Sequence, residues 1–289
     1  MRKKYVKCRE KFLDFSKEPH AHRFIRYKAF LPLKLDEQLF RIDNKFFIEY
    51  AKFEEEIKMI SFSDGKEVLD FLEKLKETLK NKSMDESSCR TSQVLIDLLL
   101  LGLEPKYKNN FAEMICDFHE KIFADQSSYA KIKGKYRTKQ VFIRDKTKKN
   151  PFEEFPWNPN MAKYVPPPAR LLDRFMDDLA AFGENGENKL LLLALKMQQL
   201  LIIHPFENGN GRISRVYVLL EMISNDLFCQ NFLFIHQAII DDEDNCLDAL
   251  NRISERDDVN KWMEVFLKIL KNCLEYNCEN VIPDYLFDY

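Results

Sequence analysis

Apolar residues recur at three- and four-residue spacing along most of the chain, and this spacing predicts a helical body. The pattern runs through residues 39–59 and 68–79, and the polar stretch at 61–65 between them predicts a turn and a helix cap. It returns at residues 92–101 and 110–123, where it predicts two more helices. We therefore expect helical segments with polar connections from the first residue onward.

The most apolar stretch of the chain, residues 190–203, carries apolar side chains nearly all round a helix. Such a helix is typical of a protein core, so we expect it to be buried at the centre. A loop rich in Asn and Gly follows at 204–212, and residues 213–227 are again mostly apolar. A last core helix is predicted near the C-terminus by Trp262, Val265, Phe266 and Leu270.

A different pattern lies between these two helical parts. Residues 136–143 alternate in polarity and contain β-branched and aromatic side chains, and residues 162–165 precede three prolines at 166–168. The stretch at 146–160 is rich in Lys and Pro. We expect two short strands flanking a polar loop, which is a β-hairpin standing on the helical body. The prolines then start an amphipathic helix.

The composition agrees with a mostly helical, soluble protein. Glycine is scarce, with 7 residues among 289, whereas a many-stranded sheet needs more turn residues. The formal net charge of −2 gives no reason to expect nucleic acid or an acidic membrane as a partner. The seven cysteines contain no C-x-x-C pair, so neither a zinc site nor a disulfide framework is expected. No apolar signal core or bilayer span is present, and we expect a cytoplasmic protein.

The loop at 204–212 has a composition that a simple turn does not explain. Asn and Gly tolerate positive φ and commonly connect helices, which accounts only for the middle of the loop. Arg212 and Arg215 lie one turn apart at the start of the next helix, where a cation opposes the helix dipole at a cost of roughly 0.3–1 kcal/mol. Because glycine N–H groups and arginines both bind polyanions, this arrangement predicts a phosphate site. His204 would stand at its mouth as a general base.

These residues resemble the Fic motif, H-x-F-x-[D/E]-G-N-[G/K]-R-x-x-R. Positions 204–215 are His-Pro-Phe-Glu-Asn-Gly-Asn-Gly-Arg-Ile-Ser-Arg, which departs from the motif at Asn208 alone. Residues 134–141 and 164–167 are similar to the two ends of the Fic flap, and residues 117–119 to the helix before it. The resemblance covers residues 110 to 270 approximately.

This resemblance implies a fold and a division of the chain. The fold would be mostly α, with a Fic-like helical core, a β-hairpin flap over the active-site loop and an N-terminal helical region. We expect residues 1–90 to form that N-terminal region, with an inhibitory segment in it. Residues 91–275 would be the Fic domain, and residues 276–289 a tail.

The resemblance also implies a role for each motif residue. His204 would deprotonate a Ser, Thr or Tyr hydroxyl of a target protein, which attacks the α-phosphate of ATP and expels pyrophosphate. Phe206 would pack into the core and hold the loop. The phosphates would be bound by Gly209, Asn210, Gly211, Arg212 and Arg215. The flap would align the target chain by strand addition through Gln140, Val141, Phe142, Ile143, Lys163, Tyr164 and Val165.

Asn208 stands where the family usually has Asp or Glu as the magnesium ligand. An amide oxygen can coordinate Mg²⁺, but it brings no charge, so we expect weaker metal binding and attenuated catalysis. Gly211 in place of Lys disfavours the kinase branch of the family.

Many Fic proteins also carry an inhibitory helix of the form [S/T]-x-x-x-E-[G/N]. The best match here is Ser83-Met84-Asp85-Glu86-Ser87, preceded by Lys82 where Ser or Thr should stand. One hypothesis is that Glu86 pairs with Arg215 and restrains activity. The alternative is a solvated acidic connector.

The leading interpretation is a protein adenylyltransferase that uses ATP and Mg²⁺ and also modifies itself. A second keeps the enzyme but changes the donor nucleotide (UTP, GTP or a phosphocholine-bearing nucleotide) or reverses the direction towards AMP removal. A third is a Fic-fold nucleotide-binding regulator with attenuated catalysis. The expected partners are ATP and a hydroxyl-bearing target protein, without nucleic acid or membrane, and a homodimer is left open.

Overall fold

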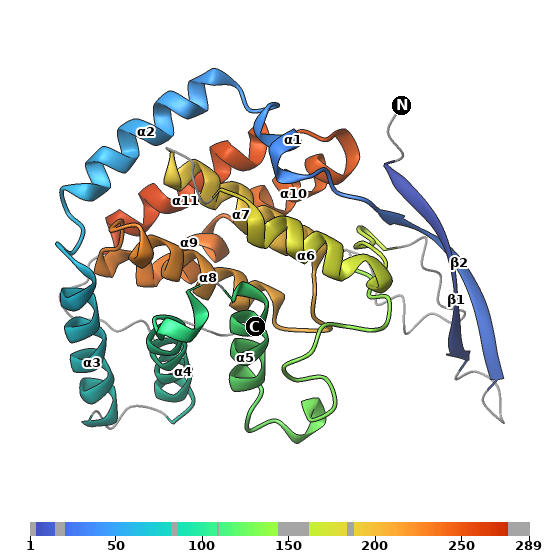
Figure 1. Ribbon diagram of the computed structural model, residues 1–289, viewed down its shortest axis with the longest axis horizontal. Helices are drawn as coiled ribbons and strands as arrows, with labels where there is room; N and C mark the ends of the chain where they lie inside the picture. The colour runs from blue at the N-terminus through green and yellow to red at the C-terminus, as the bar shows by residue number, and fades with distance from the viewer. Residues whose placement is uncertain are drawn as a thin grey trace.

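The computed structural model describes residues 4–14, 21–81, 86–108, 110–143, 162–183 and 188–276, and it gives residues 10–14, 21–25, 80–81 and 86–91 by their backbone alone. Most of the described chain is helical, as the hydrophobic spacing predicts (Figure 1). The α-helices are α1 (Leu35–Leu39), α2 (Asn44–Lys58), α3 (Gly65–Asn81), α4 (Glu86–Gly102), α5 (Phe111–Ile122), α6 (Leu172–Ala181), α7 (Lys189–Ile203), α8 (Asn210–Ser224), α9 (Ile235–Asp241), α10 (Glu243–Arg256) and α11 (Asn260–Glu275). Short 3-10 helices are η1 (Pro105–Tyr107), η2 (Ser127–Tyr129), η4 (Ala169–Leu171) and η5 (Gln230–Phe234).

Helix α7 is the centre of the core, as its apolar composition predicts. Helices α1, α2, α6, α8 and α11 all pack against it (Figure 1). On α11, the Trp262 ring is buried and its Nε1–H donates to the Ala194 carbonyl oxygen of α7 at 2.7 Å. The hydrophobic cluster that begins at Phe30 and ends at Cys273 is continuous, so α1 to α3 share one core with the later helices.

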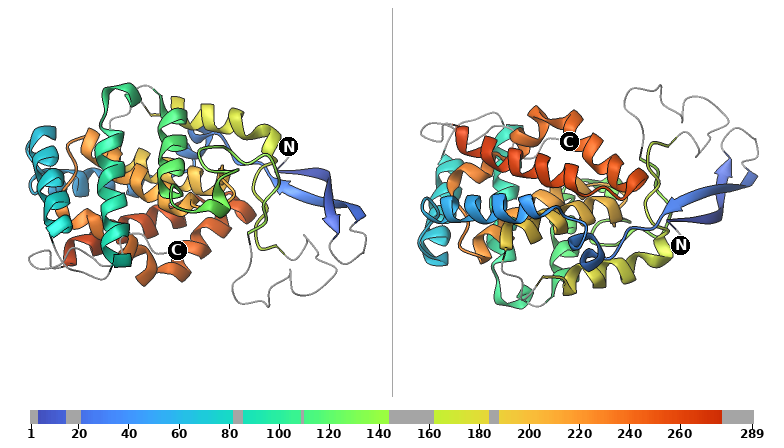
Figure 2. Two further views of the ribbon diagram at one scale, coloured as in Figure 1. Left: turned by 90° about the horizontal axis from the view of Figure 1, so that it is seen from below. Right: turned by 90° about the horizontal axis from the view of Figure 1, so that it is seen from above.

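The N-terminal region departs from the helical prediction. Residues Tyr5–Asp14 and Ala21–Phe30 are strands β1 and β2, which pair antiparallel and extend away from the helices (Figure 2). They form strands because alternate side chains, Cys8, Tyr27 and Ala29, are buried against Phe142 and Val165. That contact joins segments more than a hundred residues apart in the sequence, and local periodicity does not show it.

Two further predictions need correction or remain open. The connector expected at residues 81–90 is shorter, because α3 continues to Asn81 and α4 begins at Glu86. In the expected flap hairpin, the described residues form one antiparallel bridge, between Ile143 and Tyr164, and not two strands. The rest of that hairpin lies outside the described residues. None of the helices in the described part of the chain combines the length and hydropathy of a bilayer span.

Candidate active site

The site is built on the sharp connection between α7 and α8. His204 ends α7 with a left-handed backbone (φ 51°, ψ 61°), and Gly209 precedes α8 with φ 78°. A Cβ atom at Gly209 would lie 2.9 Å from the Phe123 ring, so only glycine fits there. Helix α8 begins at Asn210, three residues earlier than the apolar pattern predicts. Arg212 therefore lies in its first turn and Arg215 in its second.

The side chain of Asn210 holds the loop closed. It is 3% exposed, its Oδ1 accepts from the Phe206 N–H at 3.0 Å, and its Nδ2 donates to the Phe206 carbonyl oxygen at 2.9 Å. Both ends of the amide are thus used within the loop. The groups left for an anion are the backbone N–H groups of the first turn of α8, which have no carbonyl oxygen four residues before them in the helix.

The buried His119 of α5 packs against the active-site loop. The His119 ring stacks on Phe206 with centroids 4.2 Å apart. Its Nδ1 accepts from the Gly134 N–H at 2.9 Å, and its Nε2 lies 3.2 Å from the Asn208 carbonyl oxygen. Burial, with a smaller contribution from the Arg212 charge, lowers the pKa of His119 to about 4. The neutral ring with Nε2–H satisfies both contacts.

Arg137 ties the flap to the active-site loop. It is 3% exposed and is surrounded by main-chain oxygens. Its Nε donates to the His204 carbonyl oxygen at 2.8 Å, its Nη2 to that of Pro167 at 2.6 Å, and its backbone N–H to that of Pro205 at 2.8 Å. The guanidinium therefore fixes the end of α7, the loop and the segment after the flap in one arrangement.

His204 is held as a neutral imidazole. Burial, and next the charge of Arg137, lower its pKa to about 4. Its Nδ1 lies 3.4 Å from the Leu201 carbonyl oxygen, which favours the tautomer with hydrogen on Nδ1. Nε2 is then the proton acceptor. The residue is half-buried, so part of its surface is open to solvent.

Arg212 and Arg215 place two positive charges close together at the start of α8, and Arg215 is buried. Arg215 is 9% exposed, its Nε is buried without a hydrogen-bond partner, and no carboxylate of the described residues pairs with it. Burial, and next the nearby charge of Arg212, lower the pKa of Arg215 to about 10. The Arg212 guanidinium lies over the Phe123 ring, 4.6 Å from its centroid. A buried cation beside another cation is costly unless an anion joins them.

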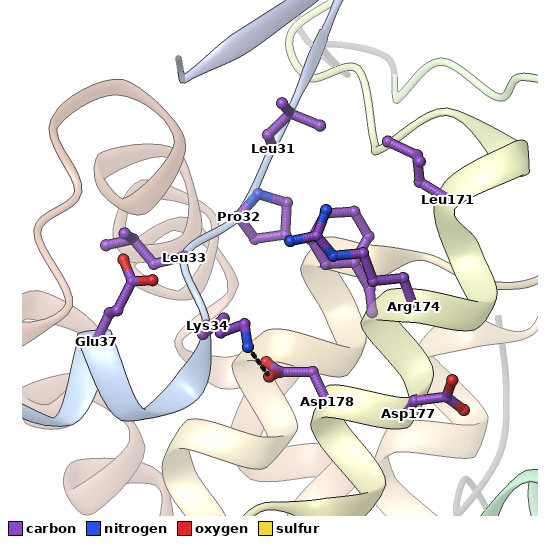
Figure 3. Close-up of a pocket in the computed structure, with 10 residues that line it drawn as sticks. Leu31, Pro32, Leu33, Lys34, Glu37, Leu171, Arg174, Asp177 and Asp178 are labelled. Atoms are coloured by element: carbon purple, nitrogen blue, oxygen red, sulfur yellow. Dashed lines mark ion pairs between the residues drawn. The ribbon is translucent and has the colours of Figure 1, made fainter. Parts of the chain in front are cut away.

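A pocket between the β2–α1 connection and α6 has a different balance of charge from the start of α8 (Figure 3). There the cations Lys34 and Arg174 share the wall with the carboxylates Asp177 and Asp178. Lys34 Nζ lies 3.9 Å from a carboxylate oxygen of Asp178. Because positive charge is matched at that wall, the phosphate site expected from the sequence fits the start of α8 better.

Both ends of the Asn208 side-chain amide already take part in hydrogen bonds. Its Oδ1 accepts from the Gly209 N–H at 2.7 Å and its Nδ2 donates to the Tyr129 hydroxyl oxygen at 2.8 Å. The described residues also contain no group of three or more His, Cys, Asp or Glu that could hold a metal ion. A neutral amide engaged in this way brings no charge to a magnesium ion, and metal binding at Asn208 stays a prediction.

The flap residues named from the sequence lie together at the base of the flap. The Ile143 N–H donates to the Tyr164 carbonyl oxygen at 2.9 Å, and the Lys163 N–H to that of Ile143 at 3.0 Å. The Gln140 side chain is buried and donates to the Pro166 carbonyl oxygen at 2.9 Å. Of the others, Phe142 contacts Tyr27 of β2 edge-on, and the Tyr164 hydroxyl donates to the Ile202 carbonyl oxygen; Val141 and Val165 are half-buried beside them.

Glu86 is the first residue of α4, and its side chain lies outside the described part of the chain. The other end of α4, at Gly102, packs against Leu220 of α8. At ~1.5 Å per residue, the length of α4 separates Glu86 from that contact by roughly 24 Å. The pairing of Glu86 with Arg215 stays a prediction.

Sequence reasoning missed His119 and Arg137 as supports of the site. Both stand in segments that it compared with the family, but their contacts are to main-chain atoms far along the chain. Arg137 could have been found as a charged residue within residues 136–143, whose alternating polarity predicts a half-buried strand.

The family model for the Fic/DOC family matches residues 110–222, which contain α5, the described base of the flap, α6, α7, the loop and most of α8. Residues 110–222 are similar to a Fic domain. The match includes every motif position and both supporting residues, so family and geometry point to the same loop. This match supports a Fic-type transferase.

Solved structures agree with this fold. A Fic family protein from Desulfovibrio desulfuricans G20 is 14% identical with a TM-score of 0.51, over 86% of this chain and 76% of that chain. Fic-1 (aa134–508) from C. elegans is also 14% identical, with a TM-score of 0.52 over 80% of this chain and 71% of that chain. At such identity the likeness concerns the fold alone. Among curated proteins, no sequence matches this chain.

Proposed function

We propose that the protein transfers AMP from ATP to a Ser, Thr or Tyr hydroxyl of a target protein. The observation that carries this proposal is the buried guanidinium of Arg215 at the start of α8, which lies beside Arg212 and pairs with no carboxylate of the described residues. A triphosphate would supply the missing negative charge. The N-terminal N–H groups of α8 add a second source of attraction for phosphate oxygens.

The reaction needs a base, and His204 can act as one. Its Nε2 would accept the proton of the target hydroxyl while the hydroxyl oxygen forms a bond to the α-phosphorus. The bond from that phosphorus to the oxygen bridging to the β-phosphate breaks, and pyrophosphate leaves. Arg212 and Arg215 would stabilise the charge on the leaving group. Bound phosphates would raise the pKa of His204 from its low value of about 4 towards neutrality, which makes it a stronger base.

The flap would position the target. An extended target chain would pair with backbone groups of the flap other than those that bridge Ile143 to Tyr164 and join Val165 to Phe30, which requires little of its side chains. Arg137 links this segment to the His204 loop through the Pro167 and His204 carbonyl oxygens. A hydroxyl aligned on the flap would thus be aligned on the base.

We propose no step through a metal ion. Because Asn208 is neutral and its amide is engaged with Gly209 and Tyr129, any magnesium would enter on the phosphates of ATP and not be held by the protein.

The test uses ATP labelled at the α or the γ phosphate, with wild-type protein and His204→Ala. We expect protein-bound label from the α position only, and its loss in His204→Ala with nucleotide affinity preserved. Label from the γ position would instead show phosphate transfer and contradict the proposal. Competition by UTP and GTP in the same assay tests the donor.

The engaged amide of Asn208 supports a second candidate, a nucleotide-binding regulator with little catalysis. Asn208→Asp decides between them, because it restores the charge at this position. If the wild type transfers no label and Asn208→Asp transfers α-label, the fold is competent and residue 208 limits it. If neither transfers label although both bind ATP, the regulator is the better description.

A further inference from the structure

The β1–β2 hairpin has two unlike faces. Because strand residues alternate in direction, Cys8, Tyr27 and Ala29 share one face. That face is buried against Phe142 and Val165 of the flap base. The hairpin is therefore a layer added to the flap.

The opposite face is basic. In the register of the two strands, Lys7 faces Lys28 and Arg9 faces Arg26, and all four residues are exposed. We call these four residues the basic face. Like charges directly opposite each other on a sheet are destabilising. Within the described residues, Lys7, Arg26 and Lys28 have no carboxylate partner.

The charge of the hairpin is opposite to that of the rest of the chain. Strands β1 and β2 contain six Lys or Arg and two Asp or Glu, a net charge of +4. Since the whole chain has a net charge of −2, the remainder carries −6. The small net charge of the whole chain gives no reason to expect a polyanionic partner, but it is the sum of a cationic hairpin and an acidic remainder.

The basic face is fixed beside the flap. The Phe30 N–H at the end of β2 donates to the Val165 carbonyl oxygen at 2.9 Å. The start of β1 is held on the other side, where the Tyr5 hydroxyl donates to the Ser254 carbonyl oxygen at 2.8 Å and Lys4 Nζ lies 3.5 Å from Asp257. From these anchors the strands extend outward (Figure 2). At ~3.3 Å per residue, Lys28 and Arg26 lie roughly 7 and 13 Å beyond the Phe30 contact.

We propose that the basic face docks an acidic segment of the target polypeptide next to the segment held by the flap. This proposal rests on the proposed function, because that function defines the target polypeptide. The binding itself requires no catalysis. An extended chain with Asp or Glu at every second position repeats its carboxylates every ~7 Å, which matches the two-residue repeat of the basic face. Lys7, Arg26 and Lys28 would each gain a counter-charge on docking.

An acidic peptide suits this surface better than nucleic acid does. Single-stranded nucleic acid is bound by stacking of bases on aromatic rings as well as by cations. Among the aromatic side chains described on this face, Phe30 is buried and Tyr5, which is 40% exposed, is tied to Ser254 through its hydroxyl. The acidic remainder of the chain would also repel a phosphate backbone longer than the hairpin.

The experiment measures binding of a fluorescein-labelled peptide of alternating Glu and Ser, and of its Gln and Ser counterpart, to the full chain by fluorescence anisotropy. The variant is Arg26→Glu with Lys28→Glu. The matched control is Lys66→Glu with Lys74→Glu, which changes the charge equally on exposed positions of α3, at the far side of the molecule (Figure 1). We expect the hairpin variant to lose affinity for the Glu peptide at least about tenfold and the control less than about twofold. The Gln peptide should not bind measurably to the wild type or to either variant.

Three outcomes overturn the proposal: unchanged binding in the hairpin variant, an equal loss in the control, or tighter binding of a single-stranded DNA of matching length with the same dependence on Arg26 and Lys28. ATP binding and the melting curve of each variant show whether it is folded. Measuring AMP transfer by the wild type beside its peptide binding separates the two proposals. In the wild type, peptide binding without any AMP transfer would contradict the proposed function alone, and AMP transfer without peptide binding would contradict the docking surface alone.

Discussion

Replacing Arg215 with Met should make the fold more stable while it weakens nucleotide binding. Arg215 is 9% exposed, and burial, followed by the charge of Arg212, lowers its pKa to about 10. A lowered pKa in a cation means that the folded state disfavours the charged form. Met has a similar apolar stem and no charge, so the substitution removes the penalty and keeps much of the packing.

The size of the effect follows from the pKa. A lowering to about 10 is worth roughly 3 kcal/mol at 1.36 kcal/mol per pKa unit, and this is an upper bound on the gain. The penalty is fully present at any pH below about 10, and it disappears only where the unfolded guanidinium also loses its proton. We therefore expect the free energy of unfolding at pH 7 to rise by about 1–3 kcal/mol, which raises the Tm by several degrees.

The assay is urea unfolding and thermal melting with and without ATP. At an ATP concentration of about 100 Kd, the wild type should gain about 2.7 kcal/mol, and Arg215→Met should gain much less. Arg170→Met is the matched control, since Arg170 is exposed, and its stability should change by no more than about 0.5 kcal/mol. If Arg215→Met is less stable than the wild type, or if ATP stabilises both equally, the charge is compensated in the protein and the argument for a phosphate site at α8 is wrong.

Two other predictions concern the loop and its support. Gly209→Ala should destabilise the protein by about 1–3 kcal/mol in urea unfolding, since its φ is 78° and its Cβ would meet Phe123. Gly65→Ala, whose Cβ meets nothing within 4 Å, should be near neutral, and equal effects would contradict the strain argument. Because the folded pKa of His119 is lowered to about 4, its contribution to stability is present above its unfolded pKa of about 6.5 and is lost as pH falls towards 4. His119→Gln should reduce the loss of stability between pH 7 and pH 4.5, and an unchanged pH profile would show that His119 is not the group responsible.

The helices that build the core could be predicted because their patterns are strong. The apolar run at 190–203 corresponds to α7 (Lys189–Ile203), since a helix apolar on all sides has no stable place except the core. The start of α8 was harder to place. Asn and Gly at 208–211 are typical of a turn, but in the structure the left-handed Gly209 ends the turn and Asn210 already belongs to the helix.

The hairpin could not be predicted in the same way. Strands β1 and β2 are stabilised by Phe142 and Val165, and the sequence alone does not show that these segments meet. The same reason applies to the supports of the candidate site. His119 and Arg137 act on main-chain atoms of the loop at 203–208, and main-chain atoms leave no mark in a residue pattern.

The structure separates two properties of the loop that the motif combines, its shape and its charge. The shape is set by Asn210, His119 and Arg137 through main-chain contacts, and none of these contacts uses the charge of residue 208. An aspartate at position 208 could accept from the Gly209 N–H as Asn208 does, and the Tyr129 hydroxyl could donate to its second oxygen. Asn208→Asp is therefore expected to keep the geometry and alter only the charge. For that reason its effect on AMP transfer would report on electrostatics at the phosphates, and a change in stability of more than about 1 kcal/mol would show that the two properties are not separable after all.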